Sequence, residues 1–155
     1  MALQFVKGDL FLSRAQTLAH GCNTRGRMGA GIAVEFKRRF PEMYQDYRRR
    51  CHKNEFRPGQ ICLYTSCTPW VLNLATQDSL GGARLEYVQQ CFQAIADSHS
   101  QSGITSLAMP RIAAGLGGLE WDDVVALLRA ILGPLPIPIV VYEEYKSGFQ
   151  AQEFL

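Results

Sequence analysis

The chain has 155 residues, of which 47% are hydrophobic, 19% are charged and 10% are aromatic. This balance is typical of one globular domain with a substantial core, and it excludes a disordered tail, a collagen-like repeat and a multi-domain enzyme. Sixteen Lys and Arg residues against fourteen Asp and Glu residues leave a net charge of +2, so binding to a polyanion would require a local basic patch.

Cysteine spacing and the lengths of apolar runs indicate in which cellular compartment the protein resides and whether it contacts a membrane. The five cysteines never occur as CxxC, and residues 1–10 lack the long apolar stretch of a signal peptide. We therefore expect free thiols, a cytoplasmic location and neither a metal site nor another cofactor. The apolar stretch 131–142 contains one glycine and three prolines. Because it is shorter than the roughly 20 residues that span a bilayer, we expect no membrane contact.

Apolar runs that indicate strands alternate with helical patterns. In chain order, the expected elements are strands at 3–6 and 17–21, helices at 31–40 and 41–51, strands at 60–64 and 70–75, a helix at 84–100, a strand at 105–109, a helix at 121–132 and a strand at 138–142. Because parallel strands need crossover connections, this order predicts an α/β fold, a three-layer α/β/α sandwich with a mixed, mainly parallel central sheet of about six strands. We expect residues 1–155 to form a single monomeric domain, with 146–155 as a partly ordered tail because it shows no clear period.

Two glycine-rich segments, 20–33 and 110–119, follow predicted strands and lead toward predicted helices. Ligands of open α/β sheets bind at the carboxyl ends of the strands, where glycines let backbone N–H groups approach an anion and a helix N-terminus adds positive potential. Either segment alone is also typical of a tight turn, but the pair suggests a diphosphate held between two loops. The motifs GxxxxGK[ST] and GxGxxG are both absent.

Three motifs in order link these segments to a known family. They are VKGDL at 6–10, AHGCN at 19–23 with RMGAGIA at 27–33, and MPRI at 109–112 followed by Gly115 and Leu116. Together they cover nearly the whole chain and resemble the macrodomain family, in the branch that contains the terminal ADP-ribose protein glycohydrolase and the DNA-ADP-ribose antitoxin macrodomains. The resemblance implies a macrodomain-like fold and ADP-ribose as the ligand.

The resemblance also assigns roles to residues. Asp9 is implied to accept a hydrogen bond from the adenine amino group, although Asp9 also suits a simple turn. Asn23 is implied to lie beside the distal ribose or to orient a water, and Tyr142 packs either beside adenine or in the core. The residues implied to bind ADP-ribose are Asp9, Leu10, Asn23, Met28, Gly29, Ala30, Gly31, Ile32, Ala113, Ala114, Gly115, Leu116, Gly117 and Tyr142. His20, which lies inside an apolar run, is expected to be structural.

Two positions depart from the pattern of this branch. Gln77 stands where the glycohydrolase has a Lys, and Gly117 stands where it has an Asp. Since an amide cannot form a Schiff base, we expect no covalent lysyl intermediate. The candidate catalytic residues are therefore Asn23, Gln77 and Asp78. Asp78 is either a general base or a surface loop residue.

Two classes of function follow from the resemblance. In the first, the protein is a hydrolase that removes ADP-ribose from an acceptor, foremost a glutamate ester on a protein, by direct attack of water at the distal ribose. In the second, it is a non-catalytic reader of ADP-ribose or of ADP-ribosylated proteins. O-acetyl-ADP-ribose and ADP-ribose-1″-phosphate are alternative substrates, and ADP-ribosylated nucleic acid is an alternative partner. Loss of both family catalytic positions favours the reader, whereas a short single-domain chain without an attached effector favours the hydrolase, because a reader usually recruits something. We favour the hydrolase.

Overall fold

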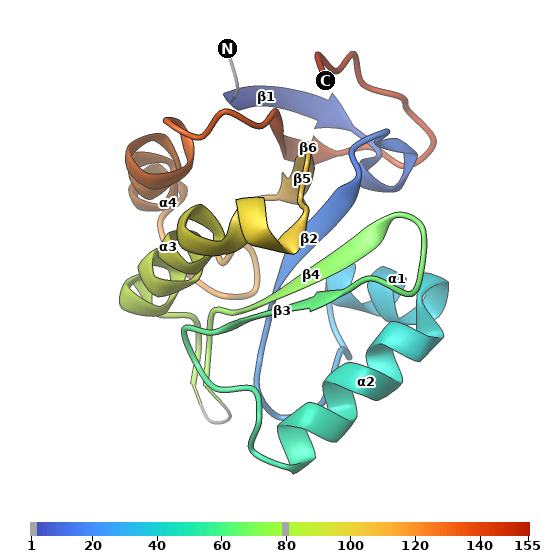
Figure 1. Ribbon diagram of the computed structural model, residues 1–155, viewed down its shortest axis with the longest axis vertical. Coiled ribbons are helices and arrows are strands. Elements are labelled where there is room, and N and C mark those ends of the chain that lie inside the picture. The colour runs from blue at the N-terminus through green and yellow to red at the C-terminus, as the bar shows by residue number, and fades with distance from the viewer. Residues whose placement is uncertain (1–2, 79–80) are drawn as a thin grey trace.

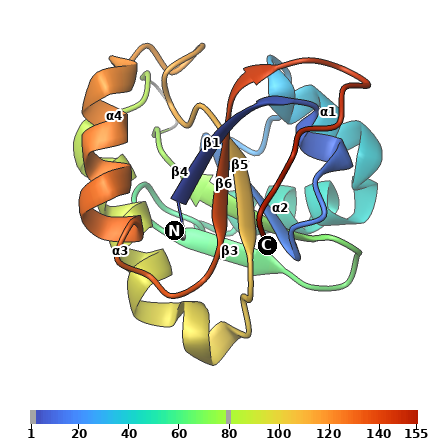
Figure 2. The same ribbon diagram turned by 90° about the horizontal axis from the view of Figure 1, so that it is seen from above.

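The computed structural model describes residues 3–78 and 81–155, which form a six-stranded sheet covered by helices on both faces (Figure 1, Figure 2). The elements in chain order are β1 (Leu3–Gly8), a 3-10 turn η1 (Leu10–Leu12), β2 (Thr17–Cys22), α1 (Ile32–Arg39), α2 (Pro41–His52), β3 (Ile61–Tyr64), β4 (Trp70–Ala75), α3 (Leu85–Ser102), β5 (Leu107–Pro110), α4 (Trp121–Leu127), a π-helical turn η2 (Leu128–Leu132) and β6 (Ile139–Tyr145).

The strands of the sheet lie in the order β1-β6-β5-β2-β4-β3. β3 pairs antiparallel with β4, while the other four pairings between these strands are parallel. α3 and α4 cover one face, and α1 and α2 cover the other (Figure 2). The predicted three-layer α/β/α sandwich with a mixed, mainly parallel sheet is confirmed.

The strands form continuous apolar runs because both faces of the sheet are buried. Leu72 and Leu74 of β4 belong to the core beneath α3, together with Phe92. Val71 of the same strand belongs to the core beneath α1 and α2, together with Phe36. All five side chains are 0% exposed, and burying one such side chain contributes about 1.5–3 kcal/mol. Two separate cores therefore hold the sheet between its helices.

Most predicted elements agree with the structure to within two residues at each end, and two differ by more. The predicted helix 121–132 is α-helical only to Leu127, and in η2 the Gly133 N–H donates to the Leu128 carbonyl oxygen at 2.9 Å, five residues back. The predicted strand 138–142 continues as β6 to Tyr145, because its backbone keeps pairing with β1 beyond the apolar run, with Tyr145 opposite Gly8. Backbone pairing, which hydropathy does not report, sets this strand end.

Residues 146–155 pass beside the end of β1 and beside η1 (Figure 1). The Lys146 N–H donates to the Gly8 carbonyl oxygen at 2.9 Å, and the Asp9 N–H donates to the Phe149 carbonyl oxygen at 2.7 Å. This segment was predicted as a partly ordered tail because it lacks a period. Because its hydrogen bonds do not belong to a helix or a strand, a search for periodic patterns in the sequence does not predict them.

Candidate functional site

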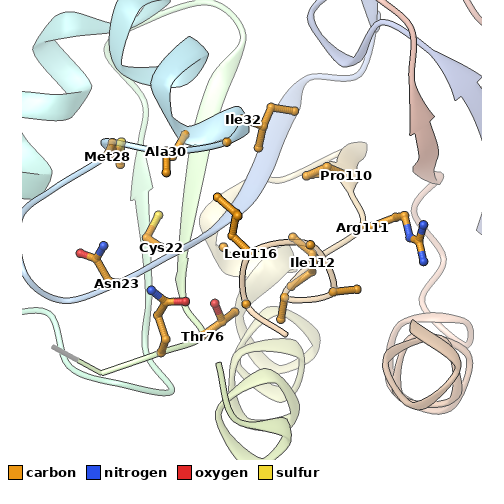
Figure 3. Close-up of a pocket in the computed structure, with 18 of the residues that line it drawn as sticks. Cys22, Asn23, Met28, Ala30, Ile32, Thr76, Pro110, Arg111, Ile112 and Leu116 are labelled. Carbon is orange, nitrogen blue, oxygen red and sulfur yellow. The ribbon is translucent and has the colours of Figure 1, made fainter. Parts of the chain in front are cut away.

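A cleft of about 570 Å³ opens at the carboxyl ends of the central strands, between the two glycine-rich segments (Figure 3). This volume lies within the range of about 300–1,000 Å³ that is usual for small-molecule sites. Its lining consists of Gly21, Cys22, Asn23, Arg27, Met28, Gly29, Ala30, Gly31, Ile32, Ala33, Thr76, Gln77, Pro110, Arg111, Ile112, Ala113, Ala114, Gly115, Leu116, Gly117, Tyr142, Glu143 and Tyr145. We call 22–31 the first loop and 111–119 the second loop.

The Asn23 side chain holds the first loop in shape. Its Nδ2 donates to the Arg27 carbonyl oxygen at 3.0 Å, and its Oδ1 accepts from the Arg25 N–H at 2.9 Å. Since a primary amide carries two N–H groups, the second can still donate to a ligand. Asn23 lines the cleft as predicted, and its first role there is to close the turn at 23–27.

Two tyrosines of α2 hold the same loop in place through hydrogen bonds from their hydroxyl groups. The Tyr47 hydroxyl lies 2.8 Å from Asn23 Oδ1 and 2.9 Å from the Asn23 carbonyl oxygen, and the Tyr44 hydroxyl donates to the Gly26 carbonyl oxygen at 3.1 Å. Burial raises the pKa of Tyr47 far above its ordinary value, so the hydroxyl remains a donor at neutral pH. Helix side chains therefore fix the first loop.

The second loop is held by its own backbone. The Leu119 N–H donates to the Ala113 carbonyl oxygen at 3.0 Å, and the Gly118 N–H donates to the Gly115 carbonyl oxygen at 3.2 Å. Ala113 adopts a positive φ of 62°, a conformation that is unusual for a residue with a Cβ. Leu116 at the tip is 77% exposed. The tip at 114–118 thus contains no buried residue, whereas Ile112 at the start of the loop belongs to the core beneath α3.

Leu116 also reaches toward the first loop. A Cβ placed on Gly31 would lie 3.2 Å from Leu116 Cδ1, and Gly31 has a φ of +61°, so both space and backbone conformation favour glycine at 31. Figure 3 shows Leu116 between the two loops. Leu116 therefore lies close to Gly31, and the two loops approach each other at this point.

Two cleft glycines are not required by the packing of the protein itself. A Cβ on Gly29 or on Gly115 would have no neighbour within 4 Å, and neither residue has a positive φ. At Gly117, by contrast, a Cβ would lie 2.5 Å from the Ala113 carbonyl oxygen. Of the fourteen glycines, only Gly29 and Gly115 combine open space with an ordinary φ. Both residues line the cleft, one in each loop, so the open space beside them is available to a ligand.

Cys22 lines the cleft, and a small buried polar cluster lies beside it. The Cys22 thiol is 3.5 Å from His20 Nε2, and His20 Nε2 is 2.8 Å from Asn73 Oδ1. Burial raises the pKa of the Cys22 thiol well above its ordinary value and lowers the pKa of His20 to about 4. The His20 ring also stacks on Phe36, with centroids 3.8 Å apart. Both titratable groups are neutral at pH 7, and the prediction of a structural His20 is confirmed.

The connection between β4 and α3 carries the remaining catalytic candidates. Gln77 lines the cleft, whereas Asp78 is not among the described lining residues. Asp78 Oδ1 accepts from the Gly81 N–H at 2.7 Å, and the Ala83 N–H donates to the Gly117 carbonyl oxygen at 3.1 Å. This connection is therefore tied to the second loop, and Asp78 contributes to its shape.

Asp9 and Leu10 also lie outside the described lining of the cleft. Asp9 is 4% exposed, and its Oδ1 accepts from the Phe11 N–H at 2.9 Å while its Oδ2 accepts from the Gly148 N–H at 2.8 Å. Leu10 is a core residue with 0% exposure. The other residues implied to bind ADP-ribose do line the cleft, and contact of Asp9 with adenine stays a prediction.

Sequence reasoning missed several lining residues. These are Gly21, Cys22, Arg27, Ala33, Thr76, Pro110, Arg111, Ile112, Glu143 and Tyr145. Most of them lie inside or directly beside the quoted motifs or the predicted strand ends. Including the residues next to each motif and strand end would have identified them. Arg111 extends away from the cleft centre (Figure 3), with its guanidinium 5.2 Å from the centre of the Trp121 ring, and the Trp121 indole N–H donates to Glu143 at 2.9 Å.

Charge is distributed unevenly along the chain. Ten of the sixteen Lys and Arg residues lie within 25–57, together with four of the fourteen acidic residues. The basic end of α2 packs against the first loop, because a Cβ on Gly26 would lie 3.2 Å from His52 Nε2 and 3.5 Å from Arg48 Cγ. Although the net charge is only +2, a basic region therefore lies beside the Asn23 end of the cleft.

Within residues 3–78 and 81–155, no group of three or more His, Cys, Asp or Glu side chains is placed to hold a metal ion. In the same part of the chain, no helix has both the length and the apolar character needed to cross a membrane. The described cleft can therefore act through backbone donors, amide side chains and a few charged side chains at its edges.

Comparisons with known proteins agree with this geometry. The family model for the macro domain matches residues 19–128. A DNA ADP-ribosyl glycohydrolase of Thermus aquaticus is 31% identical over 94% of this chain, and the match spans 42% of that relative's length. The human ADP-ribose glycohydrolase OARD1 is 32% identical, with 90% of each chain covered. The solved structure of Thermosipho africanus DarTG in complex with ADP-ribose has a TM-score of 0.87 and 32% identity, and covers 97% of this chain and 43% of that chain. Some yeast relatives are named ADP-ribose 1″-phosphate phosphatases.

Proposed function

We propose, because this chain belongs to the macro domain family, that it binds ADP-ribose in the cleft and hydrolyses the bond between ADP-ribose and an acceptor. Relatives that are named as ADP-ribosyl glycohydrolases support the hydrolase over a reader. We further propose a cytoplasmic monomer that needs no cofactor.

The observation that carries the proposal is the pair of open glycines, Gly29 and Gly115. They face the cleft from opposite loops and leave room that the protein does not fill. α1 begins at Ile32 without a side-chain cap, so its first N–H groups lack a side-chain partner at the end of the first loop. Backbone N–H groups and the positive end of a helix dipole suit a diphosphate. We therefore assign the diphosphate to the space between Gly29 and Gly115.

The proposed reaction is a direct hydrolysis. Water attacks C1″ of the distal ribose, the bond from C1″ to the acceptor breaks with its electron pair leaving on the acceptor, and the proton lost by the water passes to a base. The described lining contains no lysine, and Gln77 can orient a water or a hydroxyl but cannot form a Schiff base. The second N–H of Asn23 would position the ribose. Asp78 is the candidate base, for which its carboxylate has to turn from the Gly81 N–H toward the cleft.

A glutamate ester is the acceptor that suits this cleft best. The conjugate acid of a glutamate leaving group has a pKa of about 4.3, so the carboxylate departs without needing a proton. At the Asn23 and Gln77 end of the cleft, these two residues, Thr76 and Arg27 carry amide, hydroxyl and guanidinium groups, none of which is a strong acid, and the neighbouring Cys22 thiol has a raised pKa. Positioning and polarisation are then sufficient, and no strong general acid is required.

Two measurements on the wild-type protein test the proposal. Calorimetry should show ADP-ribose binding that raises the melting temperature and does not change when a chelator is added. Incubation with a protein that carries glutamate-linked ADP-ribose should release free ADP-ribose. Absence of binding would rule out the ligand, whereas binding without release from any linkage would leave only the reader.

A second acceptor, ADP-ribosylated nucleic acid, is favoured by the basic region beside Asn23. Arg25 and Arg48 are both exposed, and among the described residues neither has an ion-pair partner. Exposed arginines beside the distal-ribose end would contact backbone phosphates of such an acceptor and make its hydrolysis salt-sensitive. The named activity of the Thermus relative on DNA agrees with this candidate.

A charge reversal separates the two acceptors. The double variant Arg25→Glu with Arg48→Glu should slow release from a DNA-linked substrate and leave release from a glutamate-linked substrate near wild type. Arg129→Glu, which lies in η2 away from the first loop, is the matched control and should change neither. Equal rates on DNA for all three proteins would remove the nucleic-acid candidate.

A further inference from the structure

We infer that the segment 146–153, which follows β6, positions the adenine end of the cleft and sets its preference for an adenine base. The segment acts through two contacts, in which Glu153 holds Tyr142 and Gly148 holds Asp9. Glu153 and Gly148 are thus positioning residues that act through other side chains. The inference rests on the proposed function, because it takes ADP-ribose as the ligand.

Glu153 is a buried carboxylate that accepts three hydrogen bonds. It is 8% exposed, its Oε2 accepts from the hydroxyls of Ser13 at 2.5 Å and Tyr142 at 2.7 Å, and its Oε1 accepts from the backbone N–H of Arg14 at 2.9 Å. Burying a carboxylate is costly unless hydrogen bonds compensate, so these three donors fix its position. Tyr142 lines the cleft and Glu153 does not, so a group outside the lining holds this part of the wall.

Asp9 is held by the same segment. Its Oδ2 accepts from the Gly148 N–H at 2.8 Å, and its own N–H donates to the Phe149 carbonyl oxygen at 2.7 Å. The Phe11 N–H occupies Oδ1 at 2.9 Å. A carboxylate has about four acceptor sites, so Asp9 can still accept from a ligand after both backbone bonds are made. The segment therefore fixes the direction in which the remaining lone pairs point.

The segment fits tightly against β1. A Cβ on Gly8 would lie 2.8 Å from the Phe149 carbonyl oxygen and 3.0 Å from the Ala151 Cβ, so a side chain at Gly8 would displace the segment. Both views of the ribbon show the chain after β6 returning past the start of the turn that follows β1 (Figure 1, Figure 2). Residues 146–153 and the start of η1 thus form one unit beside the cleft.

The chemistry of this unit discriminates between purine bases. The exocyclic amino group of adenine donates hydrogen bonds, whereas hypoxanthine carries an accepting carbonyl oxygen at the same position. A carboxylate held in a fixed direction accepts from adenine and repels hypoxanthine, while a carboxylate that can turn away loses this distinction. Release of the segment should therefore reduce the selectivity for adenine in addition to the overall affinity.

The test compares the binding of ADP-ribose and of inosine diphosphate ribose by calorimetry. In the wild type, ADP-ribose should bind the tighter of the two. Glu153→Ala should weaken ADP-ribose binding on the order of tenfold, the equivalent of about one hydrogen bond to a charged group, and should change inosine diphosphate ribose binding much less. Glu153→Gln, which keeps an acceptor for Tyr142, should retain most of the preference.

The matched control is Gln4→Ala, which removes the bonds of the Gln4 amide to the Phe154 backbone at 2.6 and 2.8 Å but leaves Glu153 and Gly148 untouched. This variant should keep the wild-type preference. A Glu153→Ala protein that melts earlier but keeps the wild-type ratio of affinities would overturn the inference, since the role of Glu153 would then be structural only. Failure of the wild type to bind ADP-ribose would instead overturn the proposed function and the inference with it.

A measurement on the wild type covers the case in which Glu153→Ala does not fold. ADP-ribose should slow hydrogen exchange at the amides of Asp9 and Gly148, because ligand contact at Asp9 stabilises the segment that holds it. Unchanged exchange at both amides under saturating ADP-ribose would contradict the inference.

Discussion

The two glycine-rich loops face each other across one cleft but are held in different ways. Buried hydroxyls of Tyr44 and Tyr47 and the amide of Asn23 tie the first loop to α2. The second loop is anchored at its start by the buried Ile112, but its tip at 114–118 is held by backbone hydrogen bonds and leaves Leu116 largely in solvent. A segment without buried residues has a low local free energy of opening, so the tip at 114–118 is the part of the cleft wall expected to move.

This difference suggests a division of roles. The first loop is a wall that is fixed before the ligand arrives, and in the proposed complex it sets where the diphosphate and the distal ribose lie. We expect the tip of the second loop to close on the ligand, with Leu116 approaching Gly31. Changes in the first loop should therefore alter both affinity and turnover, because a fixed wall cannot adjust, whereas changes in the second should alter mainly affinity.

The largest expected effect comes from placing a carboxylate in each loop at its open glycine. Gly29→Glu and Gly115→Glu should each weaken ADP-ribose binding by about 2–4 kcal/mol, since like charges about 4 Å apart repel by about 4 kcal/mol near a protein surface. Gly29→Glu should lose more, because the braced loop cannot move aside. The controls Gly29→Ala and Gly115→Ala should bind nearly as the wild type does, since a Cβ meets open space. Wild-type affinity in either folded Glu variant would disprove the placement of the diphosphate.

The next effect concerns Asn23, which shapes the first loop and faces the cleft. Asn23→Ala should reduce ADP-ribose release on the order of ten- to a thousandfold, because misplacing the ribose or its water by about an ångström costs that much. Steady-state release from a glutamate-linked substrate measures the loss. A rate equal to that of the wild type would show that the braced turn does not position the ribose.

The region beneath the first loop should make stability pH-dependent. His20 is neutral in both states above pH 6.5, but between pH 6.5 and about 4 it is protonated only in the unfolded chain. The free energy of unfolding should therefore fall as pH falls through this window, by about 1.4 kcal/mol per pH unit and by about 3 kcal/mol in all. Urea unfolding at several pH values should show a shallower decline for His20→Gln, and identical slopes would contradict this assignment.

A smaller effect is expected from removing the hydrogen bonds of the Tyr47 hydroxyl to the first loop while keeping the buried aromatic ring. Tyr47→Phe keeps the buried ring and removes the hydroxyl that lies between α2 and Asn23, so it should cost about 1 kcal/mol of unfolding free energy. Hydrogen exchange in 23–27 should rise toward that of the second loop. Tyr64→Phe in β3 is the control, and an equal rise in that variant would refute the bracing role.

The smallest effect is expected at Gln77. Gln77→Ala should release ADP-ribose within about twofold of the wild-type rate, because an amide orients but does not attack. A complete loss of release would assign Gln77 an essential role that the proposed mechanism does not give it.

Sequence patterns predicted the sandwich and both loops because strand burial and glycine-rich turns are local properties. The bracing by Tyr44 and Tyr47 was not predictable, since these residues read as part of an ordinary helical pattern and their partners lie 18 and 24 residues earlier in the chain. Glu153 was missed because its three donors come from distant, non-periodic segments. Asp9 matched a motif, but its burial outside the cleft lining depends on the packing of 146–153.

The most direct test of the central claim, hydrolysis by water in a cleft without a catalytic lysine, is a turnover experiment with borohydride trapping. Excess protein substrate carrying glutamate-linked ADP-ribose is incubated with the wild-type protein, and both free ADP-ribose and protein-bound label are measured. We predict several equivalents of free ADP-ribose per protein and no trapped adduct. Tight binding without any release, or a covalent adduct that survives trapping, would contradict the account.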